Sequence, residues 1–207
     1  MKILIKKILR CFGYQLRKLP RGDEIDFYSI YMGMYSTAIK PILTIQIGAN
    51  DGKTNDPVHH AAKHFSDKII LVEPQRELHG DLRQNYIDFN GDLKILEYII
   101  GKSKTEQKLY CIRKEYHLDY YKRSKSNPTG ISSVNKLHVQ KMLTKHGYGY
   151  SEQEKMIEYI SIKCENLFNL LKNYLQSHTI FLQVDCEGAD WLVIQTLGDI
   201  RPNIINF

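Results

Sequence analysis

The chain has 207 residues, of which 43% are hydrophobic and 25% are charged, a composition that indicates one globular domain and excludes a disordered or fibrous chain. Its longest uncharged stretch, residues 27–39, is too short for a transmembrane helix. The four cysteines are widely separated, which disfavours a zinc site and a secreted disulfide framework and indicates a reducing, cytoplasmic location.

The net charge of +6 is concentrated at the N-terminus. Residues 1–22 contain seven Lys or Arg residues and no acid, so the rest of the chain is close to neutral. A basic protein often binds nucleic acid, but here the basic charge belongs to one terminal segment. Nucleic acid is therefore not expected as a partner.

Residues 1–19 have the pattern of an amphipathic helix with an apolar half and a basic half. Such a helix can lie on an anionic membrane, which would place the protein at the inner face of the cell membrane. It can also pack against its own domain with its basic face in solvent. A second helix is predicted over 23–39, so residues 1–40 form a helical extension ahead of Pro41.

From residue 41 onward, short apolar runs alternate with helical periods. This alternation predicts an α/β fold with a doubly wound, mostly parallel, Rossmann-like sheet in a domain of residues 41–207. Residues 110–156 interrupt the alternation and are predicted to be an inserted loop region on the substrate side. The sequence stops within its last predicted strand, so a domain truncated before its C-terminal strands is expected. The predicted strands are 42–47, 68–72, 93–100, 158–162, 179–184 and 203–207, and the predicted helices are 57–65, 76–86, 165–175 and 189–197.

Three predicted strand ends carry residues suited to a ligand. The first strand runs into a turn bracketed by Gly48 and Gly52, where the backbone can approach a ligand closely. The second strand ends at Glu73, and an acid at this place can accept hydrogen bonds from both ribose hydroxyls of an adenosine cofactor. A later strand ends in the acidic segment 185–190. A ligand is therefore expected beyond this edge of the sheet.

The glycine turn alone also allows a nucleotide hydrolase. Gly48, Gly52, Lys53 and Thr54 give G-x-x-x-G-K-T, one residue shorter than the loop that wraps a phosphate in P-loop proteins. The turn lacks G-x-G-x-x-G, which disfavours a nicotinamide dehydrogenase. Since Glu73 suits a ribose rather than a phosphate, the P-loop stays a minor alternative.

Five segments follow one another along the chain. They are Ile45-Gln46-Ile47-Gly48-Ala49-Asn50-Asp51-Gly52, Val72-Glu73-Pro74, Leu82-x-x-Asn85, Ser161-Ile162-Lys163-Cys164-Glu165-Asn166-Leu167 and Leu182-Gln183-Val184-Asp185-Cys186-Glu187-Gly188-Ala189-Asp190. In this order they resemble the FkbM-type family of S-adenosylmethionine-dependent methyltransferases, over about residues 42–207. The resemblance implies a class I methyltransferase fold, S-adenosyl-L-methionine as cofactor, and methyl transfer to a hydroxyl, typically on glycans or natural products.

The resemblance also implies cofactor-binding roles for single residues. Ribose binding falls on Glu73 beside Pro74, and contact with adenine falls on Ile100 or Gly101. Gln46 replaces an acid that is frequent in the family's first motif. It stays a cofactor-binding candidate, while recognition of the cofactor's amino group is expected to shift toward the late acidic segment, to Asp185. The cofactor loop itself falls on Gly48, Ala49, Asn50, Asp51 and Gly52.

Candidate catalytic residues lie in the same acidic segment. By the resemblance, Asp185 and Glu187 face the cofactor's methionine end and the acceptor. Either carboxylate can act as general base toward a hydroxyl, because two close carboxylates raise one pKa toward neutrality; alternatively, Glu187 caps the following helix. His60 is a lower-ranked candidate for the general base. Together with its neighbouring histidines it forms no metal-ligand pattern, and no metal is expected.

The insert interleaves tyrosines with basic residues. Such a surface can stack on sugars and pair with acidic groups, bind single-stranded nucleic acid, or be an ordinary solvated loop. Residues 131–133 are expected to reach the acceptor. The predicted function is O-methylation of a hydroxyl on a small molecule, saccharide or glycan precursor. The alternatives are a nucleotide hydrolase and a non-catalytic, membrane-peripheral module that binds the cofactor.

Overall fold

The computed structural model describes residues 25–102 and 105–207. The predicted amphipathic helix over 1–19 lies outside these described residues. Helix α2 (Phe27–Thr37) confirms the second predicted helix with a later start, and the Asp26 carboxylate caps it by accepting the Ser29 N–H at 3.3 Å. Within the described ranges, no helix combines the length and the hydropathy needed to cross a membrane.

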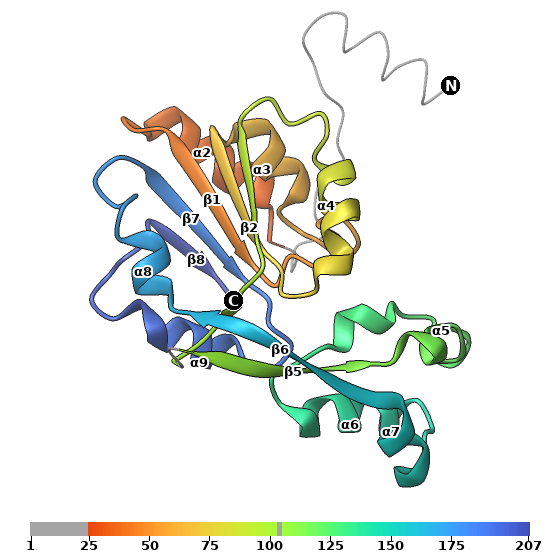
Figure 1. The fold of residues 1–207 in the computed structure, drawn as a ribbon. Coiled ribbons are helices and arrows are strands. Elements are labelled where there is room, and N and C mark those ends of the chain that lie inside the picture. Colours follow the sequence, from red (N-terminus) through yellow and green to blue (C-terminus); the bar gives the residue numbers. More distant parts are fainter. Residues whose placement is uncertain (1–24, 103–104) are drawn as a thin grey trace, which may run out of the picture.

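Five parallel strands form the central sheet, in the order β3-β2-β1-β7-β8 (Figure 1). β1 lies in the middle, and all of its residues are buried. The predicted α/β, Rossmann-like sheet is confirmed, and β1, β2 and β7 have their predicted bounds. The strands are β1 (Ile42–Ile47), β2 (Lys68–Val72), β3 (Asp92–Leu96), β7 (Thr179–Val184) and β8 (Ile204–Asn206).

Helices cover both faces of this sheet (Figure 1). On one face, Tyr31, Val58 and Leu82 are buried in the core beneath α2, α3 and α4. On the other face, Leu171 and Val193 are buried in the core beneath α8 and α9. Burial on both faces explains why the central strands read as nearly continuous apolar runs. The helices are α3 (His59–Phe65), α4 (His79–Asn85), α8 (Leu167–Leu171) and α9 (Asp190–Ile194).

A second, three-stranded sheet corrects two predictions. β4 (Ile99–Ile100) pairs in parallel with β6 (Ile157–Glu165), and β5 (Glu106–Ile112) pairs antiparallel with β6. The single predicted strand 93–100 is therefore wrong, because the chain leaves the central sheet after β3 and pairs again elsewhere. The predicted strand 158–162 is longer than expected and lies outside the parallel sheet. Hydrophobic periodicity could not show either point, since a short apolar run does not identify its partner strand.

The insert is helical, which corrects the prediction of a loop region. It extends from the long β5–β6 ribbon, away from the central sheet (Figure 1). Tyr120, Val139, Leu143 and Tyr148 are buried in a core of its own. Part of the tyrosine-rich pattern therefore reflects packing inside the insert. The helices are α5 (His117–Ser124), α6 (Lys136–Lys145) and α7 (Tyr150–Met156), with 3-10 turns at Lys114–Tyr116 and Pro128–Ile131.

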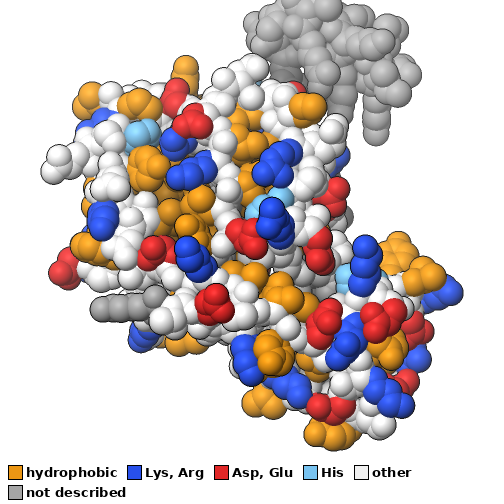
Figure 2. Space-filling view, viewed as in Figure 1, with side chains coloured by type: hydrophobic (Ala, Val, Ile, Leu, Met, Phe, Trp, Pro, Cys, Tyr) orange, Lys and Arg blue, Asp and Glu red, His pale blue; other side chains and the backbone are white. Residues whose placement is uncertain are grey.

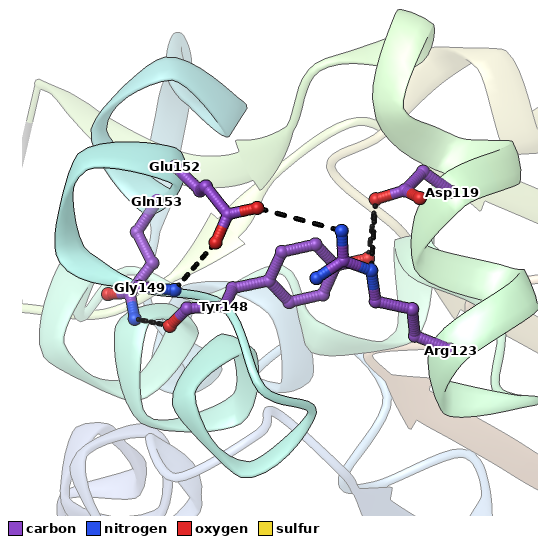
Figure 3. A network of polar contacts seen from close by, with 6 residues as sticks. All are labelled: Asp119, Arg123, Tyr148, Gly149, Glu152 and Gln153. Carbon is purple, nitrogen blue, oxygen red and sulfur yellow. Dashed lines mark hydrogen bonds and ion pairs between the residues drawn. The ribbon is translucent and has the colours of Figure 1, made fainter.

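Arg123 holds α5 against α7 (Figure 3). Its guanidinium lies over the Tyr148 ring, 4.2 Å from the centroid. The same group forms ion pairs with Asp119 at 3.5 Å and Glu152 at 3.6 Å. The Tyr148 hydroxyl in turn donates to the Asp119 carboxylate at 2.9 Å. Because a guanidinium can stack and form ion pairs at once, this network fastens the insert helices together.

Three basic residues of the insert, Arg113, Arg123 and Lys136, form ion pairs with acids. Figure 2 shows Lys and Arg side chains interspersed with Asp and Glu on the visible face of this region. Besides the Arg123 pairs, Lys136 contacts Glu154 at 2.9 Å and Arg113 contacts Glu158 at 3.9 Å. These cations therefore form a mixed surface rather than a continuous basic one.

Candidate functional site

The three predicted strand ends meet at one edge of the central sheet. The register pairs Ile47 with Val72 on one side and with Val184 on the other, so the residues after β1, β2 and β7 are neighbours. A cavity of about 320 Å³ lies at this edge. Its lining includes residues 46–50, 72–75, 98–100, 185–187, 126–127 and 129–134, together with Asp56, Leu109, Tyr120, Met142 and Gln183.

A glycine turn joins the loop after β1 to the loop after β7. The N–H groups of Gly48 and Ala49 both donate to the Val72 carbonyl, at 2.9 and 3.2 Å. Gly48 has a φ of +78°, and a Cβ at this position would lie 1.9 Å from the Asp185 carbonyl oxygen. No other residue fits there without moving the backbone, so Gly48 allows the two loops to meet at the cavity.

Glu73 lines the cavity and is 3% exposed. Its Oε2 accepts the Asn50 N–H, and its Oε1 accepts the Gln75 N–H, both at 2.8 Å. Burial raises the pKa of this carboxyl above its usual range, and the hydrogen bonds from Gln75 and Asn50 oppose the rise. A carboxylate oxygen accepts more than one hydrogen bond, so Glu73 retains capacity for ligand hydroxyls.

Gln46 offers an unpaired acceptor to the cavity. This β1 side chain is 4% exposed, and its amide nitrogen donates to the Asp56 carboxylate at 3.2 Å. Its Oε1 has no hydrogen-bond partner among the described residues. A buried polar atom without a partner is costly, so this oxygen is suited to accept an N–H from a bound ligand.

Asp185 follows β7 and presents an unpaired carboxylate. It lines the cavity, and no group in the described ranges donates a hydrogen bond to its side chain. Asp185 is exposed overall, and the partial desolvation of its carboxyl, followed by the negative charge of Asp190, raises its pKa. A carboxylate with a raised pKa and an unoccupied acceptor is chemically suited to take a proton from a hydroxyl.

Glu187 contacts the insert and does not cap α9. Its carboxylate lies 3.4 Å from His138 Nε2, and its carbonyl accepts the Ser133 hydroxyl at 3.1 Å. Helix α9 has no side-chain N-cap, which contradicts the capping alternative. Burial, and then the charges of Asp185 and Asp190, raise the pKa of Glu187. Its φ of +45° is strained for a non-glycine residue, and the insert contacts hold it there.

Tyr120 is a cavity residue that sequence reasoning did not single out. The side chain is fully buried and lines the cavity, yet its hydroxyl has no hydrogen-bond partner among the described residues. The nearest candidate is the Ser124 hydroxyl on α5, which opposes the rise that burial causes in the pKa of Tyr120 but is itself bonded to the backbone of Ser126. The Tyr148 ring stacks on Tyr120 with centroids 6.3 Å apart. In the sequence, Tyr120 is one tyrosine among several in the insert, and nothing distinguishes it from its neighbours.

The segment after β1 departs from P-loop geometry. The Asp51 carboxylate accepts the N–H groups of Lys53 at 2.9 Å and Thr54 at 2.8 Å, so Asp51 caps its own turn. Asp51, Gly52 and Lys53 are not among the described residues that line the cavity. Helix α3 begins only at His59, five residues after Thr54. A P-loop holds phosphate with its lysine and loop N–H groups, so this geometry contradicts the nucleotide-hydrolase alternative.

Two further predicted site residues lie outside the cavity. These are Gly101 and His60. Of the two residues expected to contact adenine, Ile100 lines the cavity, whereas Gly101 does not, and its N–H donates to the Glu165 carbonyl at 2.8 Å in the second sheet. His60 is exposed on α3 and is not part of the lining, so the structure does not bring it together with the other predicted site residues. In the described ranges, no group of three or more His, Cys, Asp or Glu side chains is placed to hold a metal ion.

A Rossmann-like sheet with a ligand-sized cavity beyond its carboxyl ends is the architecture of a class I methyltransferase. Residues 46–207 match the Methyltransferase FkbM domain. Because this match covers most of the chain, the protein belongs to the FkbM methyltransferase family, and it is a methyltransferase. The family implies a methyl donor. Comparisons with curated proteins and with solved structures found no match.

Proposed function

We propose that this protein transfers a methyl group from S-adenosylmethionine to a hydroxyl of an uncharged acceptor, such as a saccharide or a glycan precursor. The supporting observation is the convergence on one cavity of a buried carboxylate, an unpaired amide oxygen and an unpaired carboxylate. These groups belong to Glu73, Gln46 and Asp185. They match the ribose, the ammonium group and the acceptor hydroxyl of such a reaction.

The donor half of the cavity fits S-adenosylmethionine. When bound, this cofactor supplies a methyl group activated on a sulfonium sulfur. Glu73 can accept from the ribose hydroxyls, and Gln46 Oε1 can accept from the ammonium group. Ile99 and Ile100 are buried beside them and offer an apolar contact to adenine.

Asp185 is the proposed general base. Methyl transfer needs the acceptor oxygen held in line with the methyl group, and a hydroxyl becomes a better nucleophile as its proton is removed. Asp185 is better placed for this role than Glu187, whose carboxylate lies against His138 of the insert at 3.4 Å and whose carbonyl accepts the Ser133 hydroxyl. The apolar side chains of Leu109 and Met142 line the same cavity and help to exclude water.

The charge of the cavity favours an uncharged acceptor. Among the described residues that line it, four are carboxylates and none is Lys, Arg or His. Phosphate and carboxylate ligands are recognised chiefly by cations in bidentate or clustered arrangements. An anionic acceptor would therefore meet repulsion without a compensating ion pair. The four carboxylates are Asp56, Glu73, Asp185 and Glu187.

The acceptor class is tested by measuring S-adenosylhomocysteine formation with neutral saccharides and with their phosphorylated counterparts. We expect turnover with neutral members and a kcat/KM lower by at least about tenfold with the phosphorylated ones, because like charges in contact cost several kcal/mol. A preference for the phosphorylated members would contradict an uncharged acceptor. Cofactor binding without turnover on any hydroxyl would favour the non-catalytic module.

Replacing Tyr120 with phenylalanine is expected to lower kcat/KM for the acceptor by about tenfold while leaving the melting temperature unchanged or slightly raised. The hydroxyl is buried with at most a weak contact to Ser124, so its removal costs little internal hydrogen bonding, whereas an acceptor would lose a donor. Tyr148→Phe is the matched control, because it loses the bond to Asp119 and should lower the melting temperature. A similar fall for Tyr120→Phe would mean that its hydroxyl is structural.

A further inference from the structure

Gln75 connects the end of β2 to the insert. It is 5% exposed and lines the cavity two residues after Glu73. Its side-chain amide donates to Glu73 Oε1 at 3.3 Å and to the Thr129 carbonyl at 3.2 Å. Its own Oε1 accepts the Ser132 hydroxyl at 3.0 Å. The amide nitrogen and the amide oxygen of Gln75 therefore both bind the 128–132 turn of the insert, and the nitrogen also binds the Glu73 carboxylate.

A second contact closes this arrangement into a ring. The Asn50 N–H donates to Glu73 Oε2, and the Asn50 side-chain oxygen lies 3.3 Å from the Thr129 hydroxyl, which also has the Asn127 side-chain oxygen as an acceptor at 2.8 Å. The two residues that hold the Glu73 carboxylate, Asn50 and Gln75, thus both contact Thr129 of the insert. The insert is bonded to the donor half of the cavity as well as lining the acceptor half.

The groups around Glu73 make an amide a suitable partner for it. The Nε2 atom of His79 on α4 lies 2.8 Å from the Glu73 carbonyl oxygen. The Cys186 thiol, in the loop after β7, is close enough for the charge of Glu73 to act on it. A glutamine amide neither gains nor loses a proton in the working pH range, so it can donate to the carboxylate at every pH.

We propose that Gln75 is a positioning residue through which the insert completes the donor site, so that cofactor affinity depends on the contact between Gln75 and the 128–132 turn. This inference rests on the proposed function, in which Glu73 binds the ribose. In the absence of the Gln75 side-chain contacts, the carboxylate keeps its backbone donors and its indirect connection to the insert through Asn50, but it loses the side-chain connection through Gln75. The insert then fixes the orientation of the carboxylate less firmly.

The test is titration of the full chain with S-adenosylhomocysteine. We expect Gln75→Met to weaken binding by about tenfold and Ser132→Ala, which removes only the insert's bond to Gln75, by about two- to fivefold. Thr144→Ala is the control, since this α6 residue loses a bond to Gln153 within the insert and touches neither Gln75 nor Glu73. Its affinity should equal that of the wild type, even if the insert is less stable.

The pH dependence of binding separates positioning from a loss of packing. An amide that donates to a carboxylate favours its ionised form, so Gln75→Met should raise the pKa of Glu73 further. Protonated Glu73 is a poorer acceptor, so affinity should fall on the acid side of the pH profile. This fall, the acid limb of binding, should begin at a higher pH in Gln75→Met than in the wild type. His79 and Cys186 are present in both proteins and cannot cause the difference.

Three outcomes decide the matter. Weaker binding in both variants together with the displaced acid limb supports the proposal. Wild-type affinity in Ser132→Ala, or an unmoved acid limb in Gln75→Met, would overturn it while leaving the proposed function intact. Absence of binding by the wild type would overturn the proposed function first. Ser132→Ala changes one partly buried hydroxyl, so it provides an answer even if Gln75→Met fails to fold.

Discussion

Replacing Glu73 with alanine is expected to weaken binding of S-adenosylhomocysteine by about ten- to a hundredfold, because hydrogen bonds to a charged group contribute about 1.5–3 kcal/mol. The carboxylate would accept two ribose hydroxyls in a site where it is only 3% exposed. Water cannot readily replace it there. Calorimetric titration of the wild type and the variant measures the difference directly.

Glu73→Gln is the matched control for this experiment. Alanine also leaves the N–H groups of Asn50 and Gln75 unpaired, which costs about 1–3 kcal/mol of folding stability for each buried group. Glutamine keeps the size of the side chain and one acceptor oxygen, so we expect it to fall between alanine and the wild type in both affinity and stability. Wild-type affinity in both variants would remove the ribose assignment.

Asp185→Asn is expected to reduce kcat by about 10²- to 10⁴-fold, the range associated with loss of a general base. Asparagine keeps the size of the side chain but cannot take a proton from the acceptor hydroxyl. The wild-type rate should rise with pH through the raised pKa of Asp185, and this limb should be absent in the variant. Single-turnover measurements with bound cofactor report this step apart from product release.

The stability of Asp185→Asn should move in the opposite direction from its activity. A carboxyl whose pKa is raised in the folded state costs stability once the pH exceeds its unfolded pKa, and the cost is complete above the folded value. Asparagine removes this cost, so the melting temperature at neutral pH should be equal or higher. A fall in melting temperature that parallels the loss of activity would show that Asp185 is structural.

The central sheet was predictable because its strands carry local signals. β1, β2 and β7 are short apolar runs that end at glycine or acidic residues, and their bounds agree with the prediction. Once parallel strands are expected, the approach of Gln46, Glu73 and Asp185 follows from topology alone, since their strands end at the same edge. The family motifs point to the same residues.

The second sheet and the insert were not predictable because their determinants are long-range. β5 pairs with β6 across the whole insert, and no turn signal joins them. The Gln75 side chain finds its partners 54 and 57 residues away, at Thr129 and Ser132. His60 shows the converse case, since its proximity to the predicted cofactor loop in sequence does not make it a lining residue of the cavity.

The central claim, that the cavity at the sheet edge is an S-adenosylmethionine site, is tested most directly by calorimetric titration of the full chain. S-adenosylmethionine, S-adenosylhomocysteine and ATP with magnesium are compared under one set of conditions. We expect both S-adenosyl compounds to bind at one site per chain and ATP to bind far more weakly or not at all. Tighter binding of ATP, or no binding of either S-adenosyl compound, would contradict the claim.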